Sequence, residues 1–221
     1  MPPVAGLDPS LTNFGWAVHD SDGDGPSRCL ARGRFQTSSK MLFVDRYCEM
    51  RENVSNLVAD CKNKYGVTRV GVEYPVFKDL YSEGMYGLFL YTCEALHKAK
   101  VDVIFFSPMQ VKAHARLVLG RPDGWKMMKP DMVEAAKKDT QTTMTWNHNE
   151  ADAYWVAWVA SRFWKLHDGV IKAEDLTPVE LQQFMKVHTF LRGKKEGQTV
   201  HTGILYREDE RFFRWSQEED K

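Results

Sequence analysis

The chain has 221 residues, of which 43% are hydrophobic and 12% aromatic, enough apolar material for one globular domain with a full core and a modest extension. Because 30 Lys and Arg balance 30 Asp and Glu, the total charge indicates no polyanionic partner, and any basic surface must be local. The four cysteines are far apart and form no Cys-x-x-Cys pair, which argues against a zinc site and a disulfide framework. Since no signal-peptide or membrane-spanning pattern is present, we expect a soluble, cytoplasmic protein, in the host cytoplasm if it is phage-encoded.

The first 65 residues predict a three-stranded start followed by a helix. Two apolar runs, Val4 to Leu7 and Phe14 to Val18, flank a turn-rich segment and predict a β-hairpin, and Arg28 to Thr37 supplies a third strand. Apolar side chains at intervals of three and four then predict an amphipathic helix from Met41 to Cys61, which Gly66 ends.

Strand and helix patterns alternate from there. The further elements are a strand over 67–73, a helix over 85–96, a strand over 101–106, and helices over 111–119, 131–138 and 150–166. Strands joined through helices pair in parallel within a covered sheet, so the fold class is α/β, with a mixed sheet that carries an antiparallel hairpin. The composition shifts after Asp168, which predicts a main domain over 1–167 and a C-terminal appendage over 168–221. A Thr177 to Glu180 capping box begins one short helix in the appendage.

Three carboxylates are candidates for chemistry. Asp8 and Glu73 each follow an apolar strand, and the carboxyl ends of strands are where α/β sheets place their sites. Asp152 lies near the start of a helix whose other residues are largely apolar, where an unpaired carboxylate is costly to ionise. Three acids brought together need a cation, and oxygen ligands without a Cys or His cluster indicate Mg²⁺ or Mn²⁺. Each acid alone has an ordinary alternative role as a loop or helix cap.

The motifs around these acids resemble those of a known family. Gly6 to Ala17 resembles the first motif of RuvC-type Holliday junction resolvases, which belong to the RNase H-like nuclease superfamily. Val70 to Glu73 resembles their second acidic motif, and Asn149 to Ala153 resembles their closing acidic helix in a form common in phage-encoded relatives. The resemblance covers about residues 3–166 and implies an RNase H-like mixed sheet flanked by helices.

The resemblance implies a metal-dependent endonuclease that cuts four-way junctions, and possibly other branched DNA, by two-metal-ion hydrolysis. Two Mg²⁺ ions per site are implied, with Mn²⁺ as a substitute, and no nucleotide cofactor. Asp8 is the candidate bridging ligand, and Glu73 and Asp152 would each hold one side. Lys112 and Lys129 fall where the family places basic residues near the scissile phosphate. Symmetric cutting of a junction takes two active sites, which implies a homodimer.

The fourth metal ligand stays open in the sequence. The family carries an acid or His three residues before its last Asp, whereas this chain has Asn149 there, between His148 and Glu150. Helical geometry puts His148 or Asn149 on the face of Asp152, while Glu150 would reach the site only from a loose helix start. Glu150 and His148 are equally good candidates for the fourth ligand, and Asn149 would bond to a water molecule on the metal ion.

Two stretches are locally basic. The stretch from Lys112 to Lys138 contains seven Lys or Arg and three Asp or Glu. The stretch from Lys186 to Arg214 contains seven Lys or Arg and four Asp or Glu. Phosphate contacts carry affinity without sequence information, so we expect salt-dependent binding that recognises branch shape. The alternatives are an RNase H-like or a flap and fork nuclease of the same superfamily, and a non-catalytic module that binds branched DNA. Metal-dependent nicking and substrate competition separate these readings.

Overall fold

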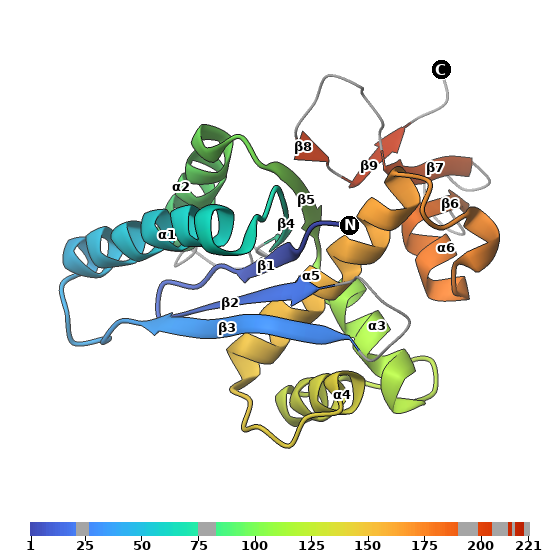
Figure 1. The fold of residues 1–221 in the computed structure, drawn as a ribbon, viewed down its shortest axis with the longest axis horizontal. Coiled ribbons are helices and arrows are strands. Elements are labelled where there is room, and N and C mark those ends of the chain that lie inside the picture. Colours follow the sequence, from blue (N-terminus) through green and yellow to red (C-terminus); the bar gives the residue numbers. More distant parts are fainter. Residues whose placement is uncertain (21–26, 75–82, 190–198, 205–211, 214, 219–221) are drawn as a thin grey trace.

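The structure is a computed structural model and describes residues 1–20, 27–74, 83–189, 199–204, 212–213 and 215–218 (Figure 1). Its strands are β1 (Val4–Asp8), β2 (Asn13–Asp20), β3 (Arg28–Gln36), β4 (Arg69–Glu73), β5 (Asp102–Phe106), β6 (Met185–Thr189), β7 (Thr199–Ile204), β8 (Phe212–Phe213) and β9 (Trp215–Glu218). Its helices are α1 (Phe43–Tyr65), α2 (Glu83–Ala99), α3 (Pro108–Leu119), α4 (Lys129–Thr140), α5 (His148–His167), the 3-10 helix η2 (Ala173–Asp175) and α6 (Pro178–Phe184).

The main sheet is mixed, in the order β3-β2-β1-β4-β5-β8. The first three strands pair antiparallel, whereas β1 with β4 and β4 with β5 pair parallel. The predicted α/β class, with a hairpin beside parallel strands, is therefore confirmed. The two-residue strand β8 pairs with β5 at the edge, which the sequence did not predict because two apolar residues give no detectable period. A second sheet, β6-β7-β9, forms in the C-terminal segment.

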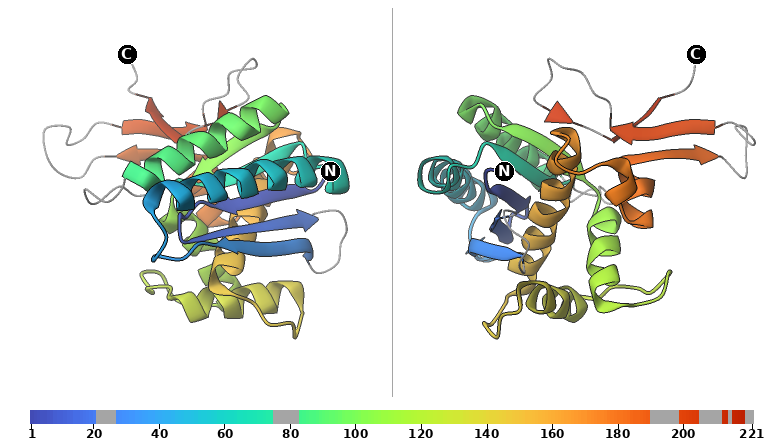
Figure 2. Two further views of the ribbon diagram at one scale, coloured as in Figure 1. Left: turned by 90° about the vertical axis from the view of Figure 1, so that its left-hand side faces the viewer. Right: turned by 45° about the vertical axis from the view of Figure 1, so that its right-hand side comes forward.

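Helices cover both faces of the main sheet (Figures 1 and 2). Helices α1 and α2 lie on one face, and α5, backed by α3 and α4, lies on the other. Alternation along β1 follows this division, since Ala5 and Leu7 belong to the core beneath α1 and α2, while Val4 belongs to the core around α5. The same alternation directs Gly6 and Asp8 toward α5.

Local chemistry sets the helix ends. Gly66 has φ 67° and caps α1, where its N–H bonds to the last carbonyls, as the sequence predicts. Ser107 and Gln110 form a reciprocal capping box at α3, with Pro108 in the first turn. Thr177 likewise exchanges hydrogen bonds with Glu180 at the start of α6. Helices α3, α4 and α5 start two or three residues before their predicted limits because capped first turns carry no apolar period, whereas α1 starts at Phe43, two residues after its predicted start.

A row of glycines lets α5 lie directly on the sheet. A methyl group on Gly6 would stand 2.1 Å from the carbonyl oxygen of Ala153, and one on Gly15 would stand 2.2 Å from the carbonyl oxygen of Asn149. On β4, a methyl group on Gly71 would stand 2.7 Å from Cβ of Ala160. Only a residue without Cβ permits this approach, so these glycines fix how closely α5 approaches β1, β2 and β4.

The segment after α5 packs back onto the domain. Phe184 of α6 is buried in the core around α5, and the fully buried Glu180 binds the guanidinium of Arg162. Most of the predicted second basic stretch, residues 190–198, 205–211 and 214, lies outside the described residues, so its expected contact with DNA stays a prediction. None of the described helices is long and apolar enough to cross a membrane.

Candidate active site

Two of the predicted acids end neighbouring parallel strands. Asp8 is the last residue of β1 and Glu73 the last of β4, and the register pairs Leu7 with Val72 immediately before them. Val72 packs beneath α1 and α2, so Glu73, like Asp8, is directed toward α5. Strand order and alternation thus bring two carboxyl groups to one end of the sheet, on one face.

The third acid, Asp152, lies on α5, which packs on the same face of the sheet. Asn149, Ala153 and Val156 contact the sheet at the glycine row, and Asp152 belongs to the same stripe at helical spacing of three and four residues. Asp152 Oδ1 is buried and has no hydrogen-bond partner. A buried carboxylate oxygen that no protein group satisfies is costly, so this atom is available to a group from outside the chain.

The three carboxyl groups perturb one another. Burial raises the pKa of Asp8 well above its usual value, and the nearby charges of Glu73 and Asp152 raise it further. Burial, then the charge of Asp152, raises the pKa of Glu73 to about 7. Burial raises the pKa of Asp152 to about 6. The groups therefore share one desolvated environment that disfavours three negative charges at once.

Two lysines oppose these shifts. Lys112 of α3 and Lys129, the first residue of α4, both lower the pKa of Asp8 and of Asp152, and Lys112 also lowers that of Glu73. The structure thus places both lysines within electrostatic reach of the acids, from two helices that pack on α5. The site combines a buried acidic centre with two cations from a different layer of the fold.

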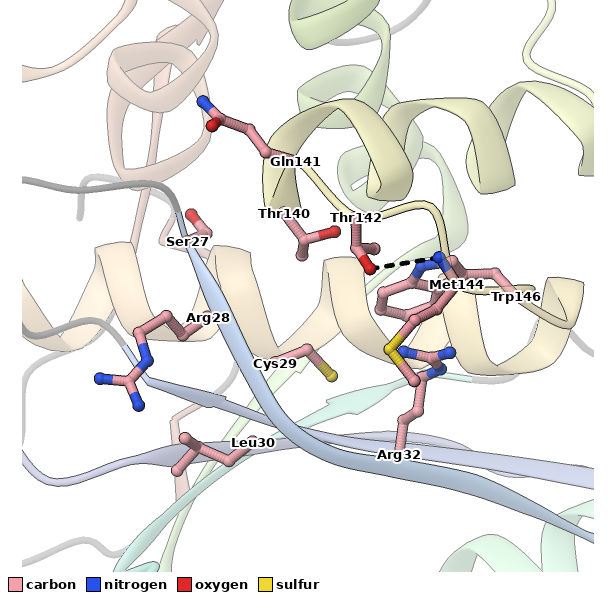
Figure 3. A pocket seen from close by; sticks show the side chains of 10 residues that line it. All are labelled: Ser27, Arg28, Cys29, Leu30, Arg32, Thr140, Gln141, Thr142, Met144 and Trp146. Atoms are coloured by element: carbon pink, nitrogen blue, oxygen red, sulfur yellow. Dashed lines mark hydrogen bonds between the residues drawn. The ribbon is translucent and has the colours of Figure 1, made fainter.

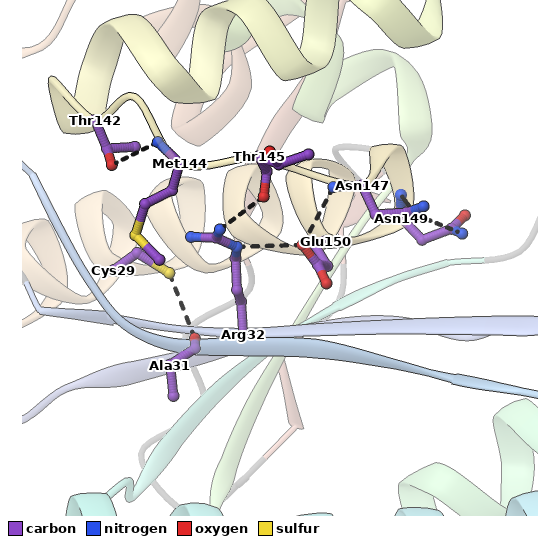
Figure 4. A network of polar contacts seen from close by, with 9 residues as sticks. All are labelled: Cys29, Ala31, Arg32, Thr142, Met144, Thr145, Asn147, Asn149 and Glu150. Atoms are coloured by element: carbon purple, nitrogen blue, oxygen red, sulfur yellow. Dashed lines mark hydrogen bonds and ion pairs between the residues drawn. The ribbon is translucent and has the colours of Figure 1, made fainter.

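The three candidates for a fourth ligand occupy different positions in the first turn of α5, which begins at His148 (Figure 4). Burial, then the nearby charges of Lys129 and Arg34, lowers the pKa of His148, which places its side chain within electrostatic reach of Lys129. The buried amide of Asn149 donates to Asn147 Oδ1 at 3.1 Å. Glu150 points toward β3, where its carboxylate binds Arg32.

The chemistry of the donor set fits a hard divalent cation. Asp8, Glu73 and Asp152 supply only oxygen ligands, and Asp152 Oδ1 lacks a protein partner. As the side chains stand, no three His, Cys, Asp or Glu residues within the described ranges form a group that could hold a metal ion. Carboxylates that share a site repel one another, so rotations of their side chains would have to accompany binding.

Comparison with known proteins identifies the fold. No family model and no curated protein matches the sequence. Among solved structures, Thermus thermophilus RuvC in complex with Holliday junction substrate is similar, with a TM-score of 0.61 and 20% identity over 76% of this chain and 97% of that chain. A second Thermus thermophilus RuvC structure gives a TM-score of 0.57 and 21% identity, over 76% of this chain and 96% of that chain.

The protein has the RuvC fold. The sequence resemblance to RuvC-type proteins of the RNase H-like superfamily is confirmed at this level, while the phage subgroup stays a prediction. Within this RuvC fold, Asp8, Glu73 and Asp152 lie on β1, β4 and α5, respectively.

Sequence reasoning missed three contributors to this RuvC-fold site. It did not predict the glycine row, because nothing in a single sequence shows that a strand glycine faces a helix backbone. Arg32 and Arg34 lie on β3 more than 110 residues from their neighbours in α5, and only the sheet order brings them there. The Asn147 to Glu150 capping box was readable as a helix-start signature and would have assigned Glu150 to the helix cap.

Replacement of Lys129 by alanine is expected to slow junction cleavage by about 10- to 100-fold, because a cation beside the acids and the phosphate is lost. The measurement is the single-turnover cleavage rate, with junction affinity at fixed ionic strength. Lys98→Ala removes a lysine that pairs with Glu94 on α2 and is expected to leave the rate unchanged. An equal effect of the two variants would contradict a role for Lys129.

Proposed function

We propose that the protein is a metal-dependent endonuclease that cuts four-way DNA junctions. The observation that carries the proposal is the convergence of Asp8, Glu73 and Asp152, with their raised pKa values, at one end of a RuvC-fold sheet. A similar solved protein, RuvC, forms a complex with Holliday junction substrate. Three carboxyl groups that together supply oxygen ligands support hydrolysis that uses a cation rather than a covalent intermediate.

In this proposal the acids would bind the metal ions and the lysines would contact the DNA. Asp8, Glu73 and Asp152 would hold two Mg²⁺ ions, with Asp8 between them. When bound, two such ions activate a water on one side of a phosphodiester and stabilise the leaving 3′ oxygen on the other. Lys112 and Lys129 would orient the scissile phosphate and offset charge that develops on it.

For the fourth ligand position, His148 is favoured over Glu150. Glu150 is held by Arg32 and by the helix cap, whereas His148, the first residue of α5, lies within electrostatic reach of Lys129, which also acts on Asp8 and Asp152. The side-chain amide of Asn149 donates a hydrogen bond to Asn147, and Asn149 packs against Gly15. A lowered pKa keeps the His148 ring neutral near neutral pH, which is the form that ligates a metal.

Binding to DNA would rest on phosphate contacts. Lys112 and Lys129 lie within electrostatic reach of the acids in an otherwise neutral protein, and contacts of such cations with phosphates recognise the course of the backbone rather than its sequence. A four-way junction presents two equivalent strands, so paired cuts require two active sites and a two-fold homodimer is the matching assembly.

The experiment compares substrates with the wild-type protein. Synthetic four-way junction, fork, flap and RNA–DNA hybrid are incubated separately and in competition, with Mg²⁺, with Mn²⁺ and with excess EDTA. Cleavage of the junction in preference to the others, in either metal and not in EDTA, is the expected result. Preference for the hybrid or the flap would assign a different nuclease specificity, and junction binding without cleavage in either metal would leave a binding module.

A further inference from the structure

Arg32 of β3 contacts Thr145, Trp146 and Glu150, at and just before the start of α5 (Figures 3 and 4). Its Nε donates to Glu150 Oε2 at 3.2 Å, and its Nη2 donates to the carbonyl oxygen of Thr145 at 2.9 Å. Its guanidinium carbon lies 3.9 Å from the centroid of the Trp146 ring. The side chains of Arg32 and Glu150 are only 15% and 18% exposed, so solvent screens this ion pair less than a surface pair. The planar guanidinium makes an ion pair, a backbone hydrogen bond and an aromatic stack at once.

The contact with Glu150 is a contact with the first turn of α5. Glu150 Oε2 also accepts the backbone N–H of Asn147 at 3.2 Å, and Asn147 Oδ1 accepts the backbone N–H of Asn149 at 3.0 Å. Arg32 therefore binds the same carboxylate oxygen that closes the helix cap. A displacement of Arg32 would loosen the cap as well as the ion pair.

A cavity of about 680 Å³ lies between β3 and the segment 140–146 (Figure 3). The side chains that line it include Cys29, Thr142 and Met144, together with Arg32 and Trp146. Trp146 anchors one end of the segment in the core around α5, while the rest of the segment borders this open space. Arg32 spans the gap and supplies the polar contacts between the two.

We infer that Arg32 is a positioning residue for the acidic centre, an inference that rests on the proposed function. Asp152 follows Glu150 by two residues in the first turns of α5. Asp152 is directed toward β1 and β4, while Glu150 is directed toward β3, so a contact that fixes Glu150 also fixes the backbone that carries Asp152. When Arg32 holds that turn, it holds Asp152 in place relative to Asp8 and Glu73. Loss of such an outer contact costs about 10- to 100-fold in metal affinity or rate, and a shift of about 1 Å is enough.

The test compares Arg32→Met, Arg32→Lys and a matched control, Arg28→Met. Arg28 lies on the same strand and lines the same cavity, but its ion pair is with Asp20 and leaves α5 untouched. Three quantities are measured well below the melting temperature: the Mg²⁺ concentration for half-maximal junction cleavage, the Kd for Mn²⁺ without DNA by calorimetry, and hydrogen exchange of the amides at 148–152.

Arg32→Met is expected to raise the Mg²⁺ midpoint and the Mn²⁺ Kd by about 10-fold or more, and to speed exchange at 148–152. Arg32→Lys, which keeps the charge but not the fork or the stack, is expected to recover part of each loss. Arg28→Met is expected to match wild type. Arg32→Met values equal to those of Arg28→Met would overturn the inference, as would slower cleavage with an unchanged Mn²⁺ Kd and unchanged exchange. If wild type cuts no junction, the proposed function fails, yet Mn²⁺ binding and exchange still decide the role of Arg32.

Discussion

Asp8→Asn is expected to abolish junction cleavage, by about 1,000-fold or more, while the protein keeps its junction affinity and gains stability near neutral pH. Burial, then the charges of Glu73 and Asp152, raises the pKa of Asp8, and as the proposed shared ligand of both ions it would be the hardest of the three acids to replace. Without metal, the variant binds the junction at least as tightly as wild type, because the removed carboxylate repels phosphate. Rates and Kd values are compared in Mg²⁺ and in EDTA, respectively.

The stability gain follows from the direction of the pKa shifts. The folded protein raises the pKa of Glu73 to about 7 and that of Asp152 to about 6, and it raises that of Asp8 as well. A carboxyl with a raised pKa favours the folded state most when protonated in both states, below about pH 4. That contribution is lost as pH rises from about 4 through the folded-state values, so the metal-free protein should lose stability between about pH 4 and pH 7.

Asp8→Asn removes one of the three charges. At pH 7.5 without metal, the variant is expected to be more stable than wild type by about 1–3 kcal/mol, and the difference should vanish near pH 4. Chemical denaturation at the two pH values measures it. Addition of Mg²⁺ should then stabilise wild type more than the variant. A variant that is less stable than wild type at pH 7.5, or one that Mg²⁺ stabilises equally, would contradict a shared acidic centre.

Much of this centre could be predicted because its acids obey local rules. Asp8 and Glu73 follow apolar strands, and parallel strands present their carboxyl ends at one edge of a sheet. Asp152 lies on the apolar stripe of a long helix, so its burial was readable from spacing alone. In each case the signal lies within a few residues of the functional side chain.

The parts that could not be predicted depend on distant partners. Arg32 and Glu150 are 118 residues apart in the sequence, and no pattern near either residue predicts their ion pair. A register shift between Val18 and His19 leaves Leu30 unpaired in β3 and turns Cys29 toward α5, which a period-two pattern misplaces. The fourth ligand stayed open in the sequence because it depends on where α5 begins, and helix ends are set by caps rather than by period.

Gly6→Ala is expected to destabilise the protein by about 3 kcal/mol and to slow cleavage by about 100-fold, although the new side chain carries no charge and only one carbon. Its Cβ would stand 2.1 Å from the carbonyl oxygen of Ala153 and 2.3 Å from the backbone nitrogen of Ala157. Both atoms belong to the helix backbone, so no rotamer change relieves the clash and α5 must move away from β1. Asp152 moves with it, away from Asp8.

Gly87→Ala is the matched control, because a methyl group there meets only the Tyr47 ring at 3.4 Å, an ordinary contact, and alanine favours the helix. Urea denaturation and single-turnover cleavage are measured for both variants. If Gly6→Ala does not fold, Gly71→Ala with and without Ala160→Gly serves instead, since the nearest atom at Gly71 is the Ala160 methyl at 2.7 Å. The second change should then recover part of the lost stability. A Gly6→Ala protein as stable and active as Gly87→Ala would show that the close approach of α5 to the sheet does not set the position of Asp152.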